Sequence, residues 1–266
     1  MIFRNQKIKM KPHEKDLRYK DRQLCIKMNT INQIIDGGTP FSIFKSYIEA
    51  YTPHINLVKF GWGSSIIDPE IVNKIKLLKD KKIPFNPGGT LFEYYYYRNK
   101  FDEYDKFLLE NGFEWIELSR GTISIDDAKY SRLLKNYSTN YSVLSEIGYK
   151  STTKSDQMTA HDWVQSCQMS IESGADLVVI EARESGTAGI VDKHGNIKDE
   201  IIKELILKVG LNRILFEAPT KELQTFLINN YGSSVNLGNI SIQNVLPLVA
   251  LRQNLRSDTL NSYQFQ

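Results

Sequence analysis

The fold class of this chain is decided by the stretch Leu177-Val178-Val179-Ile180-Glu181, a short apolar run that ends in a carboxylate. A run of about four to six residues that is rich in β-branched side chains is typical of a strand buried on both faces. Similar runs that end in or contain an acid lie at 32–36, 115–119, 143–146 and 214–217. These repeated junctions predict carboxylates that converge at one rim of a barrel.

Strand-like and helix-like stretches alternate along the chain. The expected strands span 32–36, 55–60, 83–86, 115–119, 142–147, 177–182, 214–218 and 235–237, and a helical stretch follows each of them. This alternation indicates parallel strands joined by right-handed crossovers. The length of 266 residues suits an α/β barrel of about 250 residues. We therefore predict a single-domain (β/α)8 TIM barrel over 28–266, preceded by a basic N-terminal arm over 1–27.

Composition excludes several classes of partner. The chain is 41% hydrophobic and 24% charged, which is ordinary for a soluble globular protein. Its net charge of +3, from 34 basic and 31 acidic residues, is too balanced to indicate nucleic acid. The basic excess lies mostly in the N-terminal arm, which we interpret as a solvated segment, with a specific polyanion site as the alternative.

Cysteine and histidine usage indicates the compartment. Neither Cys25 nor Cys167 has a CxxC partner, so both are expected to be buried, reduced thiols in a reducing compartment. The histidines show no metal-ligand spacing, which argues against zinc. No stretch approaches the ~18 consecutive apolar residues of a membrane span, and no secretory signal is evident. The sequence predicts a cytoplasmic protein with no membrane partner.

Two glycine-rich turns follow the second and third expected strands. They are Lys59-Phe60-Gly61-Trp62-Gly63-Ser64-Ser65 and Pro87-Gly88-Gly89-Thr90. Free amides in turns of this kind hold anions, and Lys59 adds a positive charge to the first. The alternative for both is a turn that only shapes the backbone.

Acids and bases share the ends of two later strands. Glu181 and Arg183 alternate with Ala182, and Glu146 precedes Lys150 by four residues. Such pairs either form structural ion pairs or divide the binding of a metal and an anionic substrate. Lys150 is either a solvent lysine or a group that stabilises or protonates an enolate. The carboxylates that end the strands supply oxygen ligands of the kind that Mg²⁺ uses, and the alternative for two or three of them is a structural ion pair in the barrel. They are Asp36, Glu117, Glu146, Glu181 and Glu217.

Together these motifs resemble the phosphosulfolactate synthase family. The matching blocks occur in family order over roughly 30–260 and lie at 58–65, 87–93, 146–148, 179–186, 216–219 and 235–240. The resemblance implies a (β/α)8 barrel and a carbon–sulfur lyase or synthase. It also implies Mg²⁺-dependent addition of sulfite to a small anionic substrate, phosphoenolpyruvate, which gives 2-phospho-3-sulfolactate.

The chain departs from the family pattern after several strands. Asp36-Gly37-Gly38 stands where the family has Asp-Lys-Gly, and Ser119-Arg120-Gly121 where it has Ser-Asp-Gly. Other changes place Tyr149, Thr220, Glu222 and Ser257 where the family has Lys, Gln, Ser and Gly. A charge displaced at contact distance in a buried pocket is worth on the order of a few kcal/mol. The scaffold is therefore expected to be preserved, while the substrate pocket is altered and admits either sulfite or another nucleophile.

The resemblance, together with the departure at Arg120, gives roles to individual residues as expectations. Glu146 and Glu181 would bind or orient Mg²⁺, and Lys59 and Arg183 would hold a carboxylate or phosphate. Lys150 would act on the enolate. The substrate-binding set is Gly88, Gly89, Arg120, Gly238 and Asn239. The alternatives are a barrel with a different phosphorylated or carboxylate substrate and a non-catalytic binding protein. The tyrosine run at 94–97 is interpreted as part core and part surface or subunit interface, so a homo-oligomer is compatible with the sequence.

Overall fold

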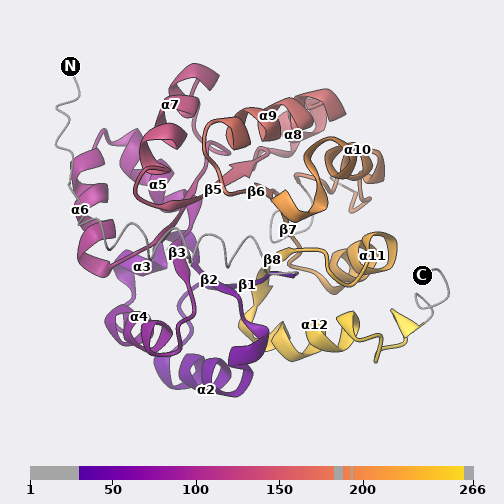
Figure 1. Ribbon diagram of the computed structural model, residues 1–266, viewed down its shortest axis with the longest axis horizontal. Coiled ribbons are helices and arrows are strands. Elements are labelled where there is room, and N and C mark those ends of the chain that lie inside the picture. Colours follow the sequence, from indigo (N-terminus) through magenta and orange to yellow (C-terminus); the bar gives the residue numbers. More distant parts are fainter. Residues whose placement is uncertain (1–29, 183–187, 193, 261–266) are drawn as a thin grey trace.

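The computed structural model describes residues 30–182, 188–192 and 194–260, and its centre is a barrel of eight parallel strands. The strands are β1 (Asn32–Asp36), β2 (Leu57–Phe60), β3 (Phe85–Pro87), β4 (Trp115–Leu118), β5 (Ser142–Ile147), β6 (Leu177–Ile180), β7 (Ile214–Glu217) and β8 (Leu237–Ser241). Each coincides with an expected strand or overlaps it. Figure 1 shows the strands at the centre and the helices around them.

The strand order closes the sheet into a barrel. Parallel ladders join the strands in the order β3-β2-β1-β8-β7-β6-β5-β4, so β1 pairs with both β2 and β8. The two ends of this series, β3 and β4, also lie in contact. The predicted (β/α)8 fold is therefore confirmed, with a seam between β3 and β4.

The helices follow the strands in alternation. They are α2 (Phe41–Tyr51), α3 (Ser64–Ile67), α4 (Ile71–Asp80), α5 (Gly89–Tyr97), α6 (Phe101–Asn111), α7 (Asp127–Tyr137), α8 (Thr152–Gln157), α9 (Ala160–Glu172), α10 (Asp199–Val209), α11 (Lys221–Tyr231) and α12 (Val245–Arg252). Short 3₁₀ turns include η2 (Gly61–Gly63) and η4 (Ile242–Asn244). Local signals explain several boundaries: Thr159 and Asp162 form a capping box at the start of α9, which satisfies two otherwise unpaired amides.

The observed bounds of the last strand and the last helix differ from the predicted ones. The last strand was expected at 235–237 but runs over Leu237–Ser241, and the last helix was expected at 241–254 but is η4 followed by α12. Gly238 and Asn239 have low strand propensity. They lie in β8 because this strand pairs with β1 on one side and β7 on the other.

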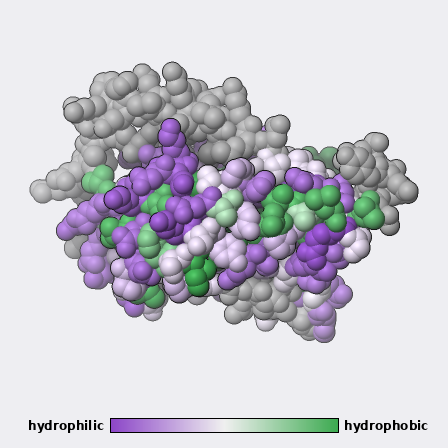
Figure 2. Space-filling view, turned by 90° about the horizontal axis from the view of Figure 1, so that it is seen from below, coloured by the Kyte–Doolittle hydropathy of each residue, from purple (hydrophilic) through white to green (hydrophobic). Residues whose placement is uncertain are grey.

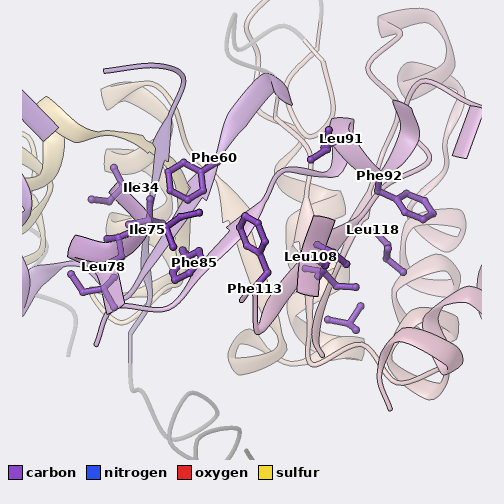
Figure 3. Close-up of a cluster of buried hydrophobic side chains, with 14 of the residues drawn as sticks. Ile34, Phe60, Ile75, Leu78, Phe85, Leu91, Phe92, Leu108, Phe113 and Leu118 are labelled. Carbon is purple, nitrogen blue, oxygen red and sulfur yellow. The ribbon is translucent and has the colours of Figure 1, made fainter. Parts of the chain in front are cut away.

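The hydrophobic core consists of an outer layer between the strands and the helices and an inner cluster within the barrel. Most of it lies between strands and helices, where Phe60, Phe85 and Phe113 pack edge to face, as Figure 3 shows. A smaller cluster fills the lower interior of the barrel and consists of Ile31, Leu57, Trp115, Leu144, Leu177, Val179 and Leu215. This cluster fills the barrel interior on the amino-terminal side of the strands. The polar side chains further along the same strands therefore gather at the carboxyl ends, where active sites of such barrels occur.

The surface and the thiols agree with the composition. Figure 2 shows hydrophilic residues interspersed with small hydrophobic groups on the face that it presents. Among the described residues, no helix is long and apolar enough to cross a membrane. Cys167 is buried, and its burial raises the pKa of the thiol to about 12; Cys25 lies outside the described residues. The expected buried thiol is therefore confirmed for Cys167.

Candidate active site

A buried lysine at the end of β2 gathers carboxylates from other strands. Lys59 Nζ lies 3.1 Å from Glu117 Oε1 of β4 and 3.0 Å from Glu217 Oε1 of β7. Burial opposes the charge of Lys59, but attraction from Glu117, and then from Glu217 and Glu146, outweighs it and raises its pKa. The ammonium group is therefore charged at every working pH.

Strand geometry brings these side chains together. Side chains two residues apart on a strand point to the same face. Lys59, Glu117, Glu146, Glu181 and Glu217 each come two residues after a member of the inner cluster, respectively Leu57, Trp115, Leu144, Val179 and Leu215. All five point into the barrel, and four of the five acids predicted to converge do so. Below, "acid cluster" means these five residues together with Lys150.

Asp36 is the exception, and the prediction that it joins the other acids is wrong. It comes two residues after Ile34, which packs in the outer layer, so it faces the helices. Its Oδ2 lies 2.7 Å from Lys74 Nζ, which also contacts Asp68 Oδ2 at 2.6 Å. Its Oδ1 accepts the amides of Gly38 and Thr39, at 3.3 and 2.8 Å. Asp36 therefore shapes the loop after β1.

Lys74 was missed by the sequence interpretation. It lies on α4, fully buried, between the spaced apolar residues Ile71, Ile75 and Leu78. The signal was present, because Lys74 is three residues after Ile71 and four before Leu78, on the apolar face of the helix. A lysine at such a position needs buried partners, and Asp36 and Asp68 supply them.

Glu117 has the most perturbed acidity in the acid cluster. Burial raises its pKa, Lys59 opposes the rise, and Glu146 and Glu217 add to it, with a result of about 7. Its Oε1 accepts the Gly89 amide at 2.9 Å, and its Oε2 has no hydrogen-bond partner among the described groups. Glu117 is thus a buried carboxyl poised to gain or lose a proton near neutral pH.

Lys150 completes the cluster from the loop after β5. Its Nζ lies 3.8 Å from Glu146 Oε1 and donates to Thr90 Oγ1 at 3.0 Å. Attraction to Glu146 raises the pKa of Lys150 against the effect of burial, and Glu93 and Glu181 add to the rise. Burial opposes ionisation of Glu146, yet Lys150, then Lys59, lower its pKa to about 2. Both groups are charged at neutral pH.

Ser119 and Glu93 hold Glu146 of the acid cluster in place through hydrogen bonds. The sequence analysis did not single them out. Ser119 Oγ lies 2.7 Å from Glu93 Oε1 and 3.0 Å from Glu146 Oε1. Glu93 Oε1 also accepts the Thr122 amide at 3.1 Å. The hydroxyl carries one hydrogen for two acceptors, so it ties Glu146 to the loop after β4 and fixes the position of that carboxylate.

The predicted anion cradle at Gly88 and Gly89 is already engaged. The Gly88 amide donates to the Phe60 carbonyl at 2.9 Å, and the Gly89 amide donates to Glu117. A side chain at Gly89 would place its Cβ 2.6 Å from Ser119 Cβ. The anion held at this turn is therefore the protein's own carboxylate.

Of the two arginines predicted to act in the site, the structure describes the contacts of Arg120 alone. The Arg120 guanidinium lies 2.6 Å from Asp127, donates to the Ile125 carbonyl at 3.0 Å and stacks over the Tyr130 ring. These contacts lie toward α7. Arg183 lies outside the described residues.

Asn239 borders a second region of the barrel mouth, whereas an added Cβ at Gly238 would meet Gln33 and Leu215. A cavity of about 410 Å³, called the neutral pocket below, is lined by Ile35, Gly37, Gly38, Thr39, Trp62, Pro219, Asn239, Ser241, Ile242 and Gln243. These residues come from the ends of β1, β2, β7 and β8 or the turns that follow them. Asn239 is in the left-handed region, with φ 54°, and its buried Oδ1 has no hydrogen-bond partner among the described groups. The predicted substrate-binding residues are thus not brought together: Gly88 and Gly89 lie at the acid cluster, Asn239 lines the neutral pocket, and Arg120 is held toward α7.

The geometry defines the class of the protein: a (β/α)8 barrel with a buried lysine and several buried carboxylates at the carboxyl ends of its strands is built as an enzyme. The model of the (2R)-phospho-3-sulfolactate synthase (ComA) family matches residues 20–258. The chain belongs to this family of lyase-type enzymes, as its motifs indicated.

Individual relatives agree. The chain is 40% identical to phosphosulfolactate synthase of Methanocaldococcus jannaschii, over 85% of this chain and 92% of the relative. It is 37% identical to phosphosulfolactate synthase of Bacillus subtilis, over 85% of this chain and 90% of the relative. Among solved structures, 3-hexulose-6-phosphate synthase from Salmonella typhimurium superposes with a TM-score of 0.54 at 13% identity, over 86% of this chain and 98% of the other. This last likeness concerns the fold alone.

Proposed function

We propose that this protein adds sulfite to phosphoenolpyruvate with the help of Mg²⁺ and forms 2-phospho-3-sulfolactate. Family membership supports this reaction, because the curated relatives are phosphosulfolactate synthases. The observation that carries the proposal is the position of Lys150, a partly exposed ammonium group 3.8 Å from the buried Glu146 at the mouth of the barrel. The addition needs such a cation where negative charge develops.

The described residues fit a magnesium ion. The acid cluster and Glu93 together hold five carboxyl groups against two ammonium groups. Glu146 also shares a hydrogen bond with the Glu181 carboxyl group, so these two acids lie close enough to hold a cation in place of a proton. No three acidic, histidine or cysteine side chains among the described residues form a metal-binding group. Mg²⁺ does not need three, because it commonly binds one or two carboxylates and completes its shell with substrate and water.

The electron flow of the addition suits this arrangement. Sulfur of sulfite forms a bond to the methylene carbon, the C=C electron pair moves toward the carboxylate, and the adjoining carbon finally takes a proton from water, so that the sum is one phosphoenolpyruvate plus one bisulfite. When bound, Mg²⁺ would act as a Lewis acid that stabilises the negative charge on the carboxylate oxygens.

The chain's own residues would do the rest. Lys150, whose pKa is raised, stays protonated and is suited to stabilising the enolate rather than to releasing a proton. Lys59 is held between Glu117 and Glu217 and would orient these carboxylates. Arg183 would hold the substrate carboxylate or phosphate.

The test is incubation of the purified protein with phosphoenolpyruvate, Mg²⁺ and sulfite, followed by ³¹P NMR. We expect a new phosphate-ester signal that requires all three components. If no new signal forms but phosphoenolpyruvate still raises the melting temperature, the substrate is retained and the nucleophile is a molecule other than sulfite. Neither a product nor a thermal shift would reject phosphoenolpyruvate as the substrate.

A further inference from the structure

The neutral pocket lies beside the acid cluster but differs from it in chemistry. None of the described residues that line it has an ionisable side chain at pH 7. Its polar groups are hydroxyls and amides, from Thr39, Ser241, Asn239 and Gln243. A ligand that binds here is met by neutral hydrogen-bonding groups.

On the side formed by the loop after β1, the pocket offers few free hydrogen-bond donors to an anion. The Gly38 and Thr39 amides, which could hold an anion, already donate to Asp36. The unpartnered Oδ1 of Asn239 is an acceptor, so it repels anionic oxygens and requires a donor such as a hydroxyl group. Phosphate, the anion carried by the proposed substrate, is the competing ligand.

Trp62 and Gly37 give the pocket an apolar wall. The Trp62 side chain is 53% exposed and its backbone is left-handed, with φ 52°. Its ring lies so close to Gly37 that an added Cβ would be 1.7 Å from ring carbon Cζ3. The indole can therefore take this position only because residue 37 has no side chain, where the family pattern has lysine.

The size of the pocket exceeds what sulfite needs. Its volume of about 410 Å³ is more than ten times the ~30 Å³ that one water takes in the liquid. A four-atom oxyanion would leave most of it to solvent. The volume suits a small organic group.

We propose that the neutral pocket is a subsite for an uncharged, hydroxyl-bearing group of the polyol or sugar class, and that Gly37 and Trp62 determine this specificity. The C–H face of such a group packs on the indole, and its hydroxyls donate to Asn239 and exchange hydrogen bonds with Thr39, Ser241 and Gln243. The inference goes beyond the proposed function: neither phosphoenolpyruvate nor sulfite carries such a group, so the neutral pocket takes a separate ligand beside the reacting molecules.

Binding to the full-length protein tests the proposal without turnover. Methyl glucoside and erythritol are the neutral probes and inorganic phosphate is the anionic one, each followed by calorimetry and saturation-transfer NMR. We expect a neutral probe to bind, and Gly37→Ala and Trp62→Ala to weaken it by at least about tenfold, equivalent to ~1.4 kcal/mol. Tyr97→Ala, which removes another exposed ring (77% exposed) on α5, should bind like the wild type.

The outcomes separate this inference from the proposed reaction. Binding of phosphate but not of the neutral probes, or neutral binding that Gly37→Ala leaves unchanged, overturns the subsite. Circular dichroism of each variant shows whether loss of binding is loss of fold, and the Trp62→Ala variant, which removes a ring without adding a clash, must give the same loss. Neutral binding without a sulfite reaction keeps the subsite and rejects the reaction. If the sulfite reaction occurs but no neutral probe binds, the proposed reaction stands and the neutral subsite is rejected.

Discussion

The two halves of the barrel mouth are built on different principles. The acid cluster on β2 and β4 to β7 places buried charges within about 3 to 4 Å of one another. The neutral pocket on β1, β2, β7 and β8 has hydroxyls, amides and one indole ring. Charges that act in chemistry must be pre-oriented and shielded from water, whereas recognition of an uncharged group needs only shape and hydrogen bonds. Under the two proposals made above, chemistry is assigned to the acid cluster and selectivity to the neutral pocket beside it.

The sequence departures fall unevenly between these halves. Gly37 replaces the family's lysine in the neutral pocket and admits the Trp62 ring. Thr220, which replaces glutamine, caps α11 by accepting the Leu223 amide at 3.3 Å. Arg120 forms an ion pair toward α7. Lys59, Glu146 and Lys150, which match the family pattern, all lie in the acid cluster, where the chemistry is proposed.

The largest effect is expected from Lys150→Ala. Removing the ammonium group leaves the enolate without its nearest cation, so turnover should fall by about 10²–10⁴-fold while the fold is retained. Steady-state kinetics and a melting curve measure the two quantities. Lys154→Ala on the following helix α8 is the matched control, because Lys154 lies over the Tyr149 ring and its variant should keep full activity. Full activity of the Lys150 variant would end the assignment.

A second comparison sets the two buried lysines against each other. Lys59→Met leaves Glu117 and Glu217 without their cation, and Lys74→Met does the same to Asp36 and Asp68. Breaking a buried ion pair from one side costs about 3–5 kcal/mol, so both variants should lose about that much free energy of unfolding in urea. Only Lys74→Met should also weaken binding to the neutral pocket, since Asp36 holds its loop. Equal binding in both variants would contradict this connection.

The pH dependence of stability isolates Glu117. Its pKa of about 7, against an ordinary 4.5, means that the folded protein keeps this proton between about pH 4.5 and 7 while the unfolded chain has lost it. The free energy of unfolding therefore falls as pH rises through this window, by at most about 3 kcal/mol. Glu146, whose pKa is lowered to about 2, loses its contribution only as the pH falls below 4.5.

The measurement compares the wild type with Glu117→Gln in urea at pH 5 and pH 8. Glutamine keeps an acceptor for the Gly89 amide and has no proton to lose in this range. The wild type should lose stability relative to this variant at the higher pH. Parallel pH profiles would show that Glu117 is ionised throughout.

The smallest effect is expected from Arg120→Ala. The pair with Asp127 is largely exposed on the aspartate side, at 77%, and exposed pairs contribute about 0–1 kcal/mol. Because the guanidinium is held toward α7, KM for phosphoenolpyruvate should change by less than about threefold, or ~0.7 kcal/mol. A much larger rise in KM would show that Arg120 turns toward the substrate and would restore its predicted binding role.

The strands and the order of the acids could be predicted because each apolar run is a local signal. Which face each acid takes could not, since it depends on which neighbouring residues fill the barrel interior. Asp36 and Glu217 end similar runs, yet Ile34 packs outside and Leu215 inside. The neutral pocket was also out of reach, because the proximity of Trp62 to Gly37 is set by loop conformations that no spacing encodes.

The seam between β3 and β4 has a consequence for motion. The other seven strand junctions are joined by backbone ladders, whereas this side of the barrel is packed by the rings of Phe60, Phe85 and Phe113. Side-chain packing yields to local opening more readily than a continuous ladder does. Transient parting of the barrel wall should therefore begin here, next to the Gly89 turn that holds Glu117, and amide hydrogen exchange would detect it first in β3.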